Sequence, residues 1–285
     1  MKTYIIEACS DLGVNIDGAK FGPKLITAGE NFDRVISVVA DEIEKNNDSN
    51  NLNKNLESVN KFNRNLYDAV RNVISHGYFP LTIGGDHSVA IGSALASIKE
   101  HGKEGIIWVD SHGDFNVPET SPSGNIHGYP FAAVCGYHNE HLSTFHNGEY
   151  FNPNNAVLVG ARDIDIPYEL QNFKDAGVTI FTTDDIKRLG VDNVMQRAFE
   201  IASNGTNGVH VSYDLDAIDP LDAPGVSVRV PNGFNSKIGE QIIDYILNEP
   251  TVNSMDLVEF NPKFDIDNKT LEVAKNFVKK INGHH

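Results

Sequence analysis

The sequence predicts an α/β protein in which a mainly parallel sheet lies between two layers of helices. Two observations predict this three-layer αβα arrangement. Short apolar runs alternate with longer segments of helical period, and several of the runs are apolar at consecutive positions, as in strands buried on both faces. No internal repeat or shift in composition divides the chain, so we expect a single domain over residues 1–285.

Seven apolar runs are expected to be strands, because each is short and most are rich in β-branched or aromatic residues. In chain order they are residues 4–8, 79–83, 105–110, 156–160, 178–181, 208–214 and 255–259.

Six longer segments are expected to be helices: 32–45, 57–75, 88–100, 191–203, 236–248 and 270–280. In the second, apolar residues recur at spacings of three and four and form one stripe, Val59, Phe62, Leu66, Val70 and Val73. Ser88 follows a Gly-Gly turn and is expected to cap the third helix. The asparagine-rich segment 46–55 favours turns and is expected to be a surface connection.

Charge and composition exclude several classes of protein. The chain has 23 basic and 39 acidic side chains, a formal net charge of −16, which opposes binding to nucleic acid or an anionic membrane. No apolar stretch approaches the ~18 residues of a membrane helix, and the N-terminus has only a very short apolar run. Two cysteines are too few for a disulfide framework. We therefore expect a cytoplasmic protein without nucleic-acid or membrane partners.

Three segments place acidic side chains and histidines directly after expected strands. They are IGGDHS with Asp86 and His87, WVDSHGDFN with Asp110, His112, Asp114 and Asn116, and VSYDLDAIDP with Asp214, Asp216 and Asp219. Strand ends of a parallel sheet bind ligands, and alternate residues of an extended segment point the same way. One such segment alone is usually a solvated loop or a helix cap. Three together predict a site for one or two divalent cations, with Mn²⁺ or Zn²⁺ favoured over Ca²⁺.

Two further residues lie at the expected strand ends. His127 lies in the glycine-containing loop SPSGNIHGYP, where a histidine is more often exposed than catalytic. Glu259 ends the last expected strand, and a buried glutamate there needs a basic neighbour or a cationic substrate.

Taken in order, the motifs IGGDHSVAIGS, IIWVDSHGDFN, SGNIHG, SYDLDAIDP and MDLVEFNP resemble the ureohydrolase family of arginases, agmatinases and formimidoylglutamases. LGVNIDGAKFGPKLI extends the likeness toward the N-terminus, and the SGNIHG loop is most similar to that of arginases. The resemblance implies a binuclear manganese hydrolase that cleaves L-arginine to L-ornithine and urea through a metal-bridging hydroxide.

The resemblance also implies roles for individual residues. One manganese ion would be held by His87, Asp110, Asp114 and Asp214, and the other by Asp110, His112, Asp214 and Asp216. His127 would pass a proton to the leaving amine, Glu259 would pair with the substrate guanidinium, and Asp114 would serve both metal and catalysis. Asn116, Ser123, Asn125 and Asp165 match positions that hold the α-amino and α-carboxylate groups of arginine. The family usually has a second acidic residue just after the turn that holds Asp165. Glu169 is the nearest candidate, but its spacing is one residue longer than in the family.

Two departures leave the substrate open. Val228 stands where arginases have a threonine, which removes a hydroxyl near the guanidinium, and Arg229 replaces an uncharged residue. A formimidoylglutamase, or a hydrolase of another guanidino acid or of agmatine, is therefore the alternative, with Arg229 facing a substrate carboxylate. A non-catalytic metal-binding homologue is disfavoured, because all six metal positions, His127 and Glu259 are intact. The family resemblance further implies a homotrimer or homohexamer.

Overall fold

An eight-stranded sheet, seen in a computed structural model that describes residues 1–48, 50–148 and 150–284, runs through the molecule. The strand order is β2-β1-β3-β8-β7-β4-β5-β6, and the paired strands are parallel. The strands are β1 Thr3–Cys9, β2 Val35–Val39, β3 Phe79–Gly84, β4 Glu104–Val109, β5 Ala156–Ala161, β6 Thr179–Thr182, β7 Gly208–Asp214 and β8 Val252–Val258.

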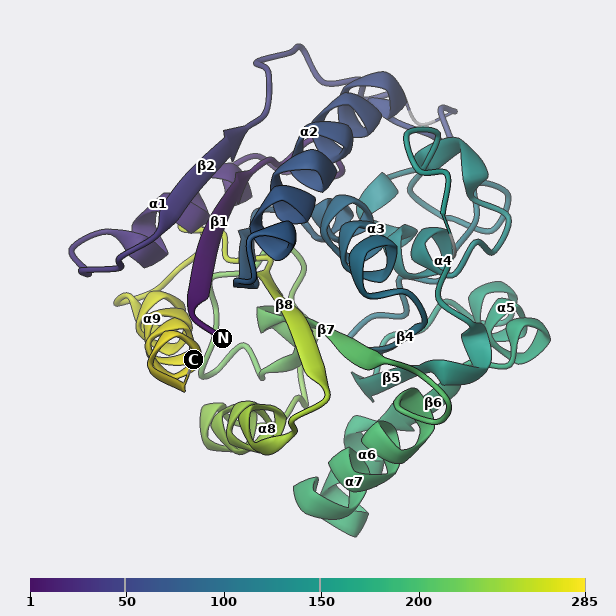
Figure 1. The fold of residues 1–285 in the computed structure, drawn as a ribbon. Helices are drawn as coiled ribbons and strands as arrows, with labels where there is room; N and C mark the ends of the chain where they lie inside the picture. Colours follow the sequence, from purple (N-terminus) through teal and green to yellow (C-terminus); the bar gives the residue numbers. More distant parts are fainter. Residues whose placement is uncertain (49, 149, 285) are drawn as a thin grey trace.

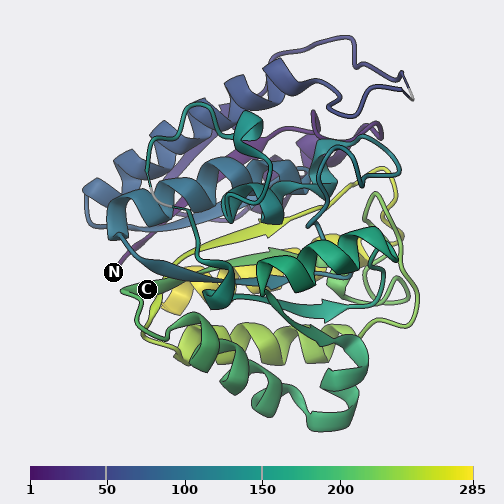
Figure 2. The ribbon, with the colours of Figure 1, turned by 90° about the vertical axis from the view of Figure 1, so that its right-hand side faces the viewer.

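Helices cover both faces of this sheet, which gives the three layers that the sequence predicts (Figures 1 and 2). One face carries α2 Leu56–Ser75, α3 Ala90–His101, α4 Pro130–Val134 and α5 Tyr168–Ala176. The other carries α1 Gly22–Thr27, α6 Thr183–Leu189, α7 Val191–Ala202, α8 Ser236–Asn248 and α9 Lys269–His284. None of the described helices is long and apolar enough to cross a membrane.

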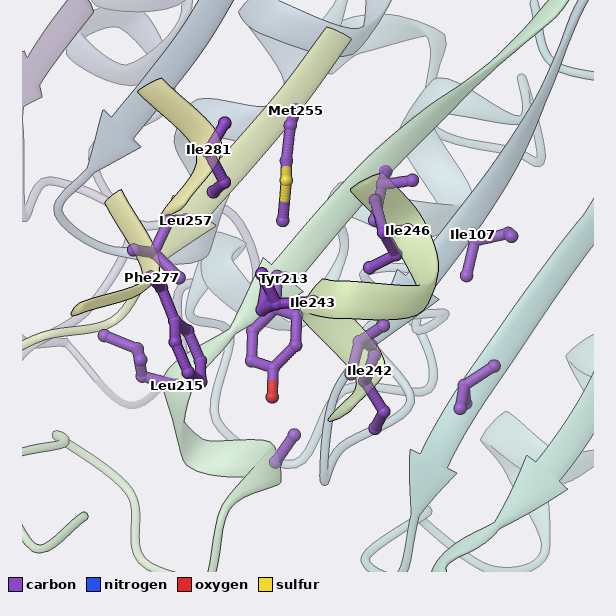
Figure 3. Packing of buried hydrophobic residues seen from close by; sticks show 14 of the residues in the cluster. Ile107, Tyr213, Leu215, Ile242, Ile243, Ile246, Met255, Leu257, Phe277 and Ile281 are labelled. Atoms are coloured by element: carbon purple, nitrogen blue, oxygen red, sulfur yellow. The ribbon is translucent and has the colours of Figure 1, made fainter. Parts of the chain in front are cut away.

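Two hydrophobic cores follow from these layers, one on each face of the sheet. Figure 3 shows the first, where α8 and α9 pack on the central strands. On the other face, α2 buries the predicted stripe of Val59, Phe62, Leu66, Val70 and Val73. With both faces covered, β3, β4, β5 and β7 are buried along their whole length.

The predicted helix over residues 32–45 is wrong. The segment forms the edge strand β2 at Val35–Val39, followed by irregular chain. Val35, Val38 and Val39 have helical spacing, but the run Val-Ile-Ser-Val-Val is β-branched at four of five positions and pairs with β1. The seven predicted strands and the other five predicted helices are present, within a few residues at their ends.

Four α-helices of the structure were not predicted, α1, α4, α5 and α6, although the sequence carries signals for α5 and α6. α5 starts directly after Pro167 and ends at Gly177, which takes the left-handed φ of 88° typical of a helix end. α6 begins with a capping box formed by Thr182 and Asp185. The connection 46–55 contains neither helix nor strand among its described residues, and residue 49 lies outside them.

Candidate metal centre

The same local turn follows three strands, β3, β4 and β7, on one edge of the sheet. Asp86, Asp110 and Asp214 each follow or end a strand, and each carboxylate accepts the backbone N–H two residues further on, over 2.7 to 2.9 Å. Such an aspartate turn reverses the chain and aims the next side chains across the strand end. The predicted convergence is therefore right, but turns produce it instead of extended alternation.

Ser88 does not cap the helix that follows β3. The turn begins a short 3-10 helix, His87–Val89, whose N-cap is Asp86, and α3 continues from it. Asp86 is fully buried and also accepts the N–H of Gly13. Burial raises the pKa of Asp86 to about 6, and the nearby Glu259 adds to the rise.

His87 is the centre of the first group of side chains. Its Nδ1 lies 3.1 Å from Oδ2 of Asp110, 3.1 Å from Oδ2 of Asp114 and 3.0 Å from Oδ2 of Asp214. The ring is buried and stacks on Trp108, whose indole N–H donates to Asp110. His87, Asp110 and Asp214 together offer ligand atoms close enough to share one metal ion.

His112 is the centre of the second group. Its Nδ1 lies 3.0 Å from Oδ2 of Asp216 and 3.4 Å from Oδ1 of Asp110. Asp110, His112 and Asp216 also offer ligand atoms to one ion, so Asp110 belongs to both groups. Asp216 is held in place by Ser111, whose hydroxyl donates to it over 2.7 Å.

The charges of these residues favour the binding of cations. Four buried carboxylates crowd together, and burial raises the pKa of Asp114 to about 6, with Asp110 adding to the rise. Burial also raises the pKa of Asp214 well above its usual value, as do Asp216 and Asp110. Nδ1 of His87 makes no hydrogen bond although three carboxylate oxygens surround it. Imidazole nitrogen and carboxylate oxygen suit Mn²⁺ or Zn²⁺, so these residues fit a pair of such ions.

A buried polar network fixes the ring of His87 from behind. Its Nε2 lies 2.9 Å from Oγ of Ser212, and the Ser212 hydroxyl donates to Asp256. The same oxygen of Asp256 also accepts from Ser93 and lies 3.0 Å from Nε2 of His210. Since the serine hydrogen is committed to Asp256, its oxygen is free to accept the Nε2 hydrogen of His87. Nδ1 then presents its lone pair to the cluster, as a metal ligand must.

Two residues of the site adopt left-handed backbone conformations. Asp114 has φ 51° and Glu259 has φ 67°, which non-glycine residues rarely take. Backbone hydrogen bonds hold both: the Asp114 carbonyl accepts from Phe131 and Ala132, and the Glu259 N–H donates to Gly85. Such strain persists where the surroundings over-determine it, often at functional sites.

A cavity of about 250 Å³ opens above these groups. The predicted site residues that line it are His87, His112, Asp114, Asn116, Ser123, Asn125, His127, Asp165, Asp214, Asp216, Val228 and Glu259. Asp110 lies just beneath, fully buried. On one wall Asn116 donates to Asp165 over 3.0 Å. Oδ1 of Asn125, another lining residue, is buried without a hydrogen-bond partner.

His127 and Glu259 meet beside the carboxylate cluster. Nδ1 of His127 lies 3.3 Å from Oε1 of Glu259, and the same oxygen accepts the N–H of His87 over 2.8 Å. His127 is therefore not the exposed loop histidine that its context favours. Burial lowers the pKa of His127, but the hydrogen bond to Glu259 and the charges of Glu259, Asp114 and Asp86 together outweigh burial and raise the pKa above its usual value.

Glu169 joins two loops beneath the cavity. Its carboxylate accepts the N–H of Phe115 and the N–H of Asp165, each over 2.9 Å. Burial raises its pKa to about 8. A β-carbon on Gly113 would stand 2.5 Å from this carboxylate, so the glycine is required for the contact. The spacing of Glu169 in the sequence left its place open, and the structure puts it against the cavity.

Arg229 does not face the cavity. Its guanidinium donates to the backbone carbonyls of Pro224, over 2.7 Å, and Phe264, over 2.6 Å, and the residue is not among those lining the cavity. The expectation that Arg229 meets a substrate carboxylate is therefore wrong. Val228, its neighbour, does line the cavity.

Comparisons with known proteins agree with this geometry. The model of the arginase family matches residues 1–283. An arginase of Staphylococcus aureus is 37% identical over 287 residues, which cover 96% of this chain and 94% of that protein. The native structure of arginase from Bacillus caldovelox has a TM-score of 0.91 at 34% identity, over 99% of both chains. Entamoeba histolytica arginase, solved in complex with L-ornithine, has a TM-score of 0.89 at 26% identity, over 99% of this chain and 98% of the other.

The family match spans nearly the whole chain, and it coincides with two His/Asp groups that share Asp110 at the sheet edge. The chain therefore belongs to the arginase family and is a ureohydrolase.

Proposed function

We propose that this enzyme hydrolyses L-arginine to L-ornithine and urea, with two manganese ions as cofactor. The observation that carries the proposal is the placement of His127 and Glu259 side by side over the two His/Asp groups, within one cavity. The similar proteins support arginine as the substrate, because those 37% to 40% identical are arginases.

Six residues would hold the two ions. His87, Asp110, Asp114 and Asp214 would hold one, and Asp110, His112, Asp214 and Asp216 the other. The first set is the group of His87, Asp110 and Asp214 with Asp114 added, whose Oδ2 lies 3.1 Å from Nδ1 of His87. The second set is the group of Asp110, His112 and Asp216 with Asp214 added. Bound there, divalent ions supply the Lewis acidity that makes water a nucleophile at neutral pH.

The substrate guanidinium would lie against Glu259. The carboxylate is buried, and its Oε1 already accepts from His87, so its second oxygen remains for the guanidinium hydrogens. A cationic substrate also supplies the positive partner that a buried strand-end glutamate needs. This contact orients the guanidinium carbon over the metal ligands.

His127 would supply the proton that the leaving group needs. Hydrolysis adds water to the guanidinium carbon and breaks its bond to the internal nitrogen of arginine, which departs as the amine of ornithine. That nitrogen must gain a proton. Glu259 favours the protonated ring of His127, so the imidazole is prepared to donate. Deprotonated His127 can then accept a proton from the next water.

The far end of arginine would meet the rim of the cavity. Asp165, held by Asn116, offers a carboxylate to the α-ammonium group, and Ser123 and Asn125 offer hydrogen bonds to the α-carboxylate. The alternative with formimidoylglutamate or another guanidino acid was based on Val228 and Arg229. Val228 lines the cavity but has no polar group that would recognise another substrate, and the Arg229 guanidinium is bonded to backbone carbonyls elsewhere. No observation now favours it over arginine.

A substrate panel tests the proposal. The manganese-loaded protein is given L-arginine, agmatine, guanidinobutyrate and formimidoylglutamate, and urea and formamide are measured. We expect urea from arginine with the highest kcat/KM. Urea from another guanidine alone would overturn arginine as substrate, and no product at all would indicate a non-catalytic homologue.

A matched pair of variants tests the role of His127. His127→Asn is expected to lower kcat by 10²-fold or more, the usual contribution of a general acid or base. His76→Asn is the control, since His76 is exposed at the end of α2 and should leave kcat unchanged. Equal kcat values for the two variants would remove His127 from the mechanism.

We further propose that the chain assembles into homotrimers or homohexamers, on the family resemblance alone. Light scattering on the manganese-loaded protein tests this, and a monomer would overturn it.

A further inference from the structure

A buried lysine stands behind the loop that carries Ser123 and Asn125. Lys54 is only 5% exposed, and its Nζ donates to the backbone carbonyl of Ser123 over 2.7 Å. Lys54 does not line the cavity, whereas Ser123 does. Its ammonium group is thus one hydrogen bond away from a residue that lines the cavity.

This ammonium group lacks a carboxylate partner. Within residues 1–48, 50–148 and 150–284, the lysine ion pairs are made by other lysines, and Lys54 has a carbonyl as its partner. Burying a cation without an anion is costly, so the position needs a compensating negative charge.

The chain around Lys54 fixes the ammonium group in this place. The Lys54 N–H donates to the carbonyl of Gly124 over 3.2 Å, and the Tyr129 hydroxyl donates to the carbonyl of Leu52 over 2.7 Å. Gly124 has φ +70°, and a β-carbon there would stand 2.2 Å from the carbonyl oxygen of Asn51. Residues 51–55 and 121–125 are therefore packed together backbone to backbone, with little freedom for either.

The charges around the cavity are arranged unequally. Acidic side chains line it, among them Asp114, Asp214, Asp216 and Glu259, and Asp165 lines it beside Asn116. Behind the loop that holds Ser123 lies a positive charge, the ammonium group of Lys54. A zwitterionic amino acid matches this pattern, with its ammonium group toward Asp165 and its carboxylate toward the loop.

We propose that Lys54 is a specificity-determining, positioning residue that makes the loop 121–125 select ligands with a carboxylate. The inference rests on the proposed function, since it concerns the same cavity. The ammonium group attracts the ligand carboxylate through the loop, and in a partly buried setting such attraction is less screened than in water. The carboxylate in turn supplies the negative charge that buried Lys54 lacks.

Binding of two matched ligands tests this without turnover. L-Ornithine carries the carboxylate, and L-ornithinamide replaces it with a neutral amide of nearly the same shape. Calorimetry on the manganese-loaded protein gives Kd for each. In the unaltered protein we expect L-ornithine to bind more tightly. Lys54→Met should raise the Kd of L-ornithine about tenfold, an electrostatic change of ~1.4 kcal/mol, and leave that of L-ornithinamide within twofold.

Two further variants separate charge from structure. Lys54→Gln keeps a donor for the Ser123 carbonyl but no charge, so it should behave like Lys54→Met. Lys54→Arg keeps the charge and should retain the preference. Lys61→Met is the control, because Lys61 is exposed on α2 and pairs only with Asp41 at the surface. With L-arginine as substrate, Lys54→Met should raise KM and keep kcat within twofold.

Three results would overturn the inference. They are an equal rise in the Kd of both ligands in Lys54→Met, an unchanged preference for L-ornithine over L-ornithinamide in Lys54→Gln, and equal Kd values for the two ligands in the unaltered protein. If L-ornithine binds as expected but the unaltered protein releases no urea from arginine, the proposed function fails and the role of Lys54 stands.

Discussion

Gly113 and Glu169 show how single residues set the shape of the loop after β4, which carries His112 and Asp114. Gly113 lies between His112 and Asp114, and only a missing side chain lets the Glu169 carboxylate approach it. From there Glu169 bonds the N–H groups of Phe115 and Asp165, so one carboxylate ties the loop after β4 to the loop after β5.

Gly113→Ala is expected to destabilise the metal-free protein by about 1–3 kcal/mol, because the new methyl group displaces Glu169 and leaves two buried N–H groups unsatisfied. Denaturant unfolding measures the loss, and manganese titration should show weaker binding. Gly128→Ala is the control, since Gly128 lines the same cavity but has no atom within 4 Å of the added carbon. Equal stability of the two variants would contradict this account.

Residues differ in how visible their roles are in the sequence. Asp110, His112 and Asp214 follow strands in recognisable motifs, so their meeting could be predicted. The role of Lys54 could not be predicted, because it lies in a polar connection that is typical of the protein surface. Its burial depends on a loop 69 residues further along the chain. Glu169 likewise becomes meaningful only when β5 and β4 are neighbours.

At the scale of elements, strands β7 and β8 support the metal centre from below. Ser212 on β7 and Asp256 on β8 face each other in register, and they connect His87 to His210. The central strands thus carry a polar network within an otherwise apolar sheet.

Asp256→Asn is expected to weaken manganese binding 10- to 100-fold, the usual effect of removing a partner that orients a ligand histidine. Calorimetric titration of the metal-free protein measures it. Asp244→Asn, at an exposed position on α8, should bind manganese as the unaltered protein does. A folded Asp256→Asn protein with unchanged affinity would mean that the network does not orient His87.

The edge strand β2 shows where a periodic pattern misleads. An edge strand is only half covered, so apolar residues occur on its exposed face as well as on its covered face. The valines of β2 therefore do not alternate strictly, and their spacing resembles that of a helix. Val35 and Val39 are indeed exposed, and strand propensity decides the structure. In β4 and β7, by contrast, complete burial makes the apolar run unambiguous.

At the scale of the whole molecule, the carboxylate cluster makes stability depend on metal. Asp110, Asp114, Asp214 and Asp216 are all buried and close together, so their mutual repulsion opposes folding until cations bind. The formal net charge of −16 therefore has a local component at one edge of the sheet.

Manganese is expected to raise Tm of the metal-free protein by about 5 °C at a hundredfold excess over Kd, since such binding adds ~2.7 kcal/mol. Scanning calorimetry with increasing Mn²⁺ measures this. Asp214→Asn should abolish the rise and, by removing a buried charge, increase Tm of the metal-free protein. A manganese-dependent rise that survives in Asp214→Asn would place the ions elsewhere.

The order of strands could not be predicted from the sequence, although the strands themselves could. β8 is the last strand of the chain, yet it lies between β3 and β7 in the centre of the sheet. An apolar run indicates that a strand is buried, but it does not indicate which strand will be its neighbour in the sheet.

Because β8 lies between β3 and β7, the two groups of side chains in the site are expected to form one after the other as the chain is synthesised and folds. β4 and β7 are direct neighbours, so Asp110, His112, Asp214 and Asp216 can come together before the last strand exists. His87 follows β3, which is separated from β7 by β8, and Glu259 directly follows β8. The group around His112 is therefore expected to form first. The group around His87 and Glu259, the carboxylate proposed to bind the guanidinium, are expected to form together, once β8 pairs with β3 and β7 and closes the sheet.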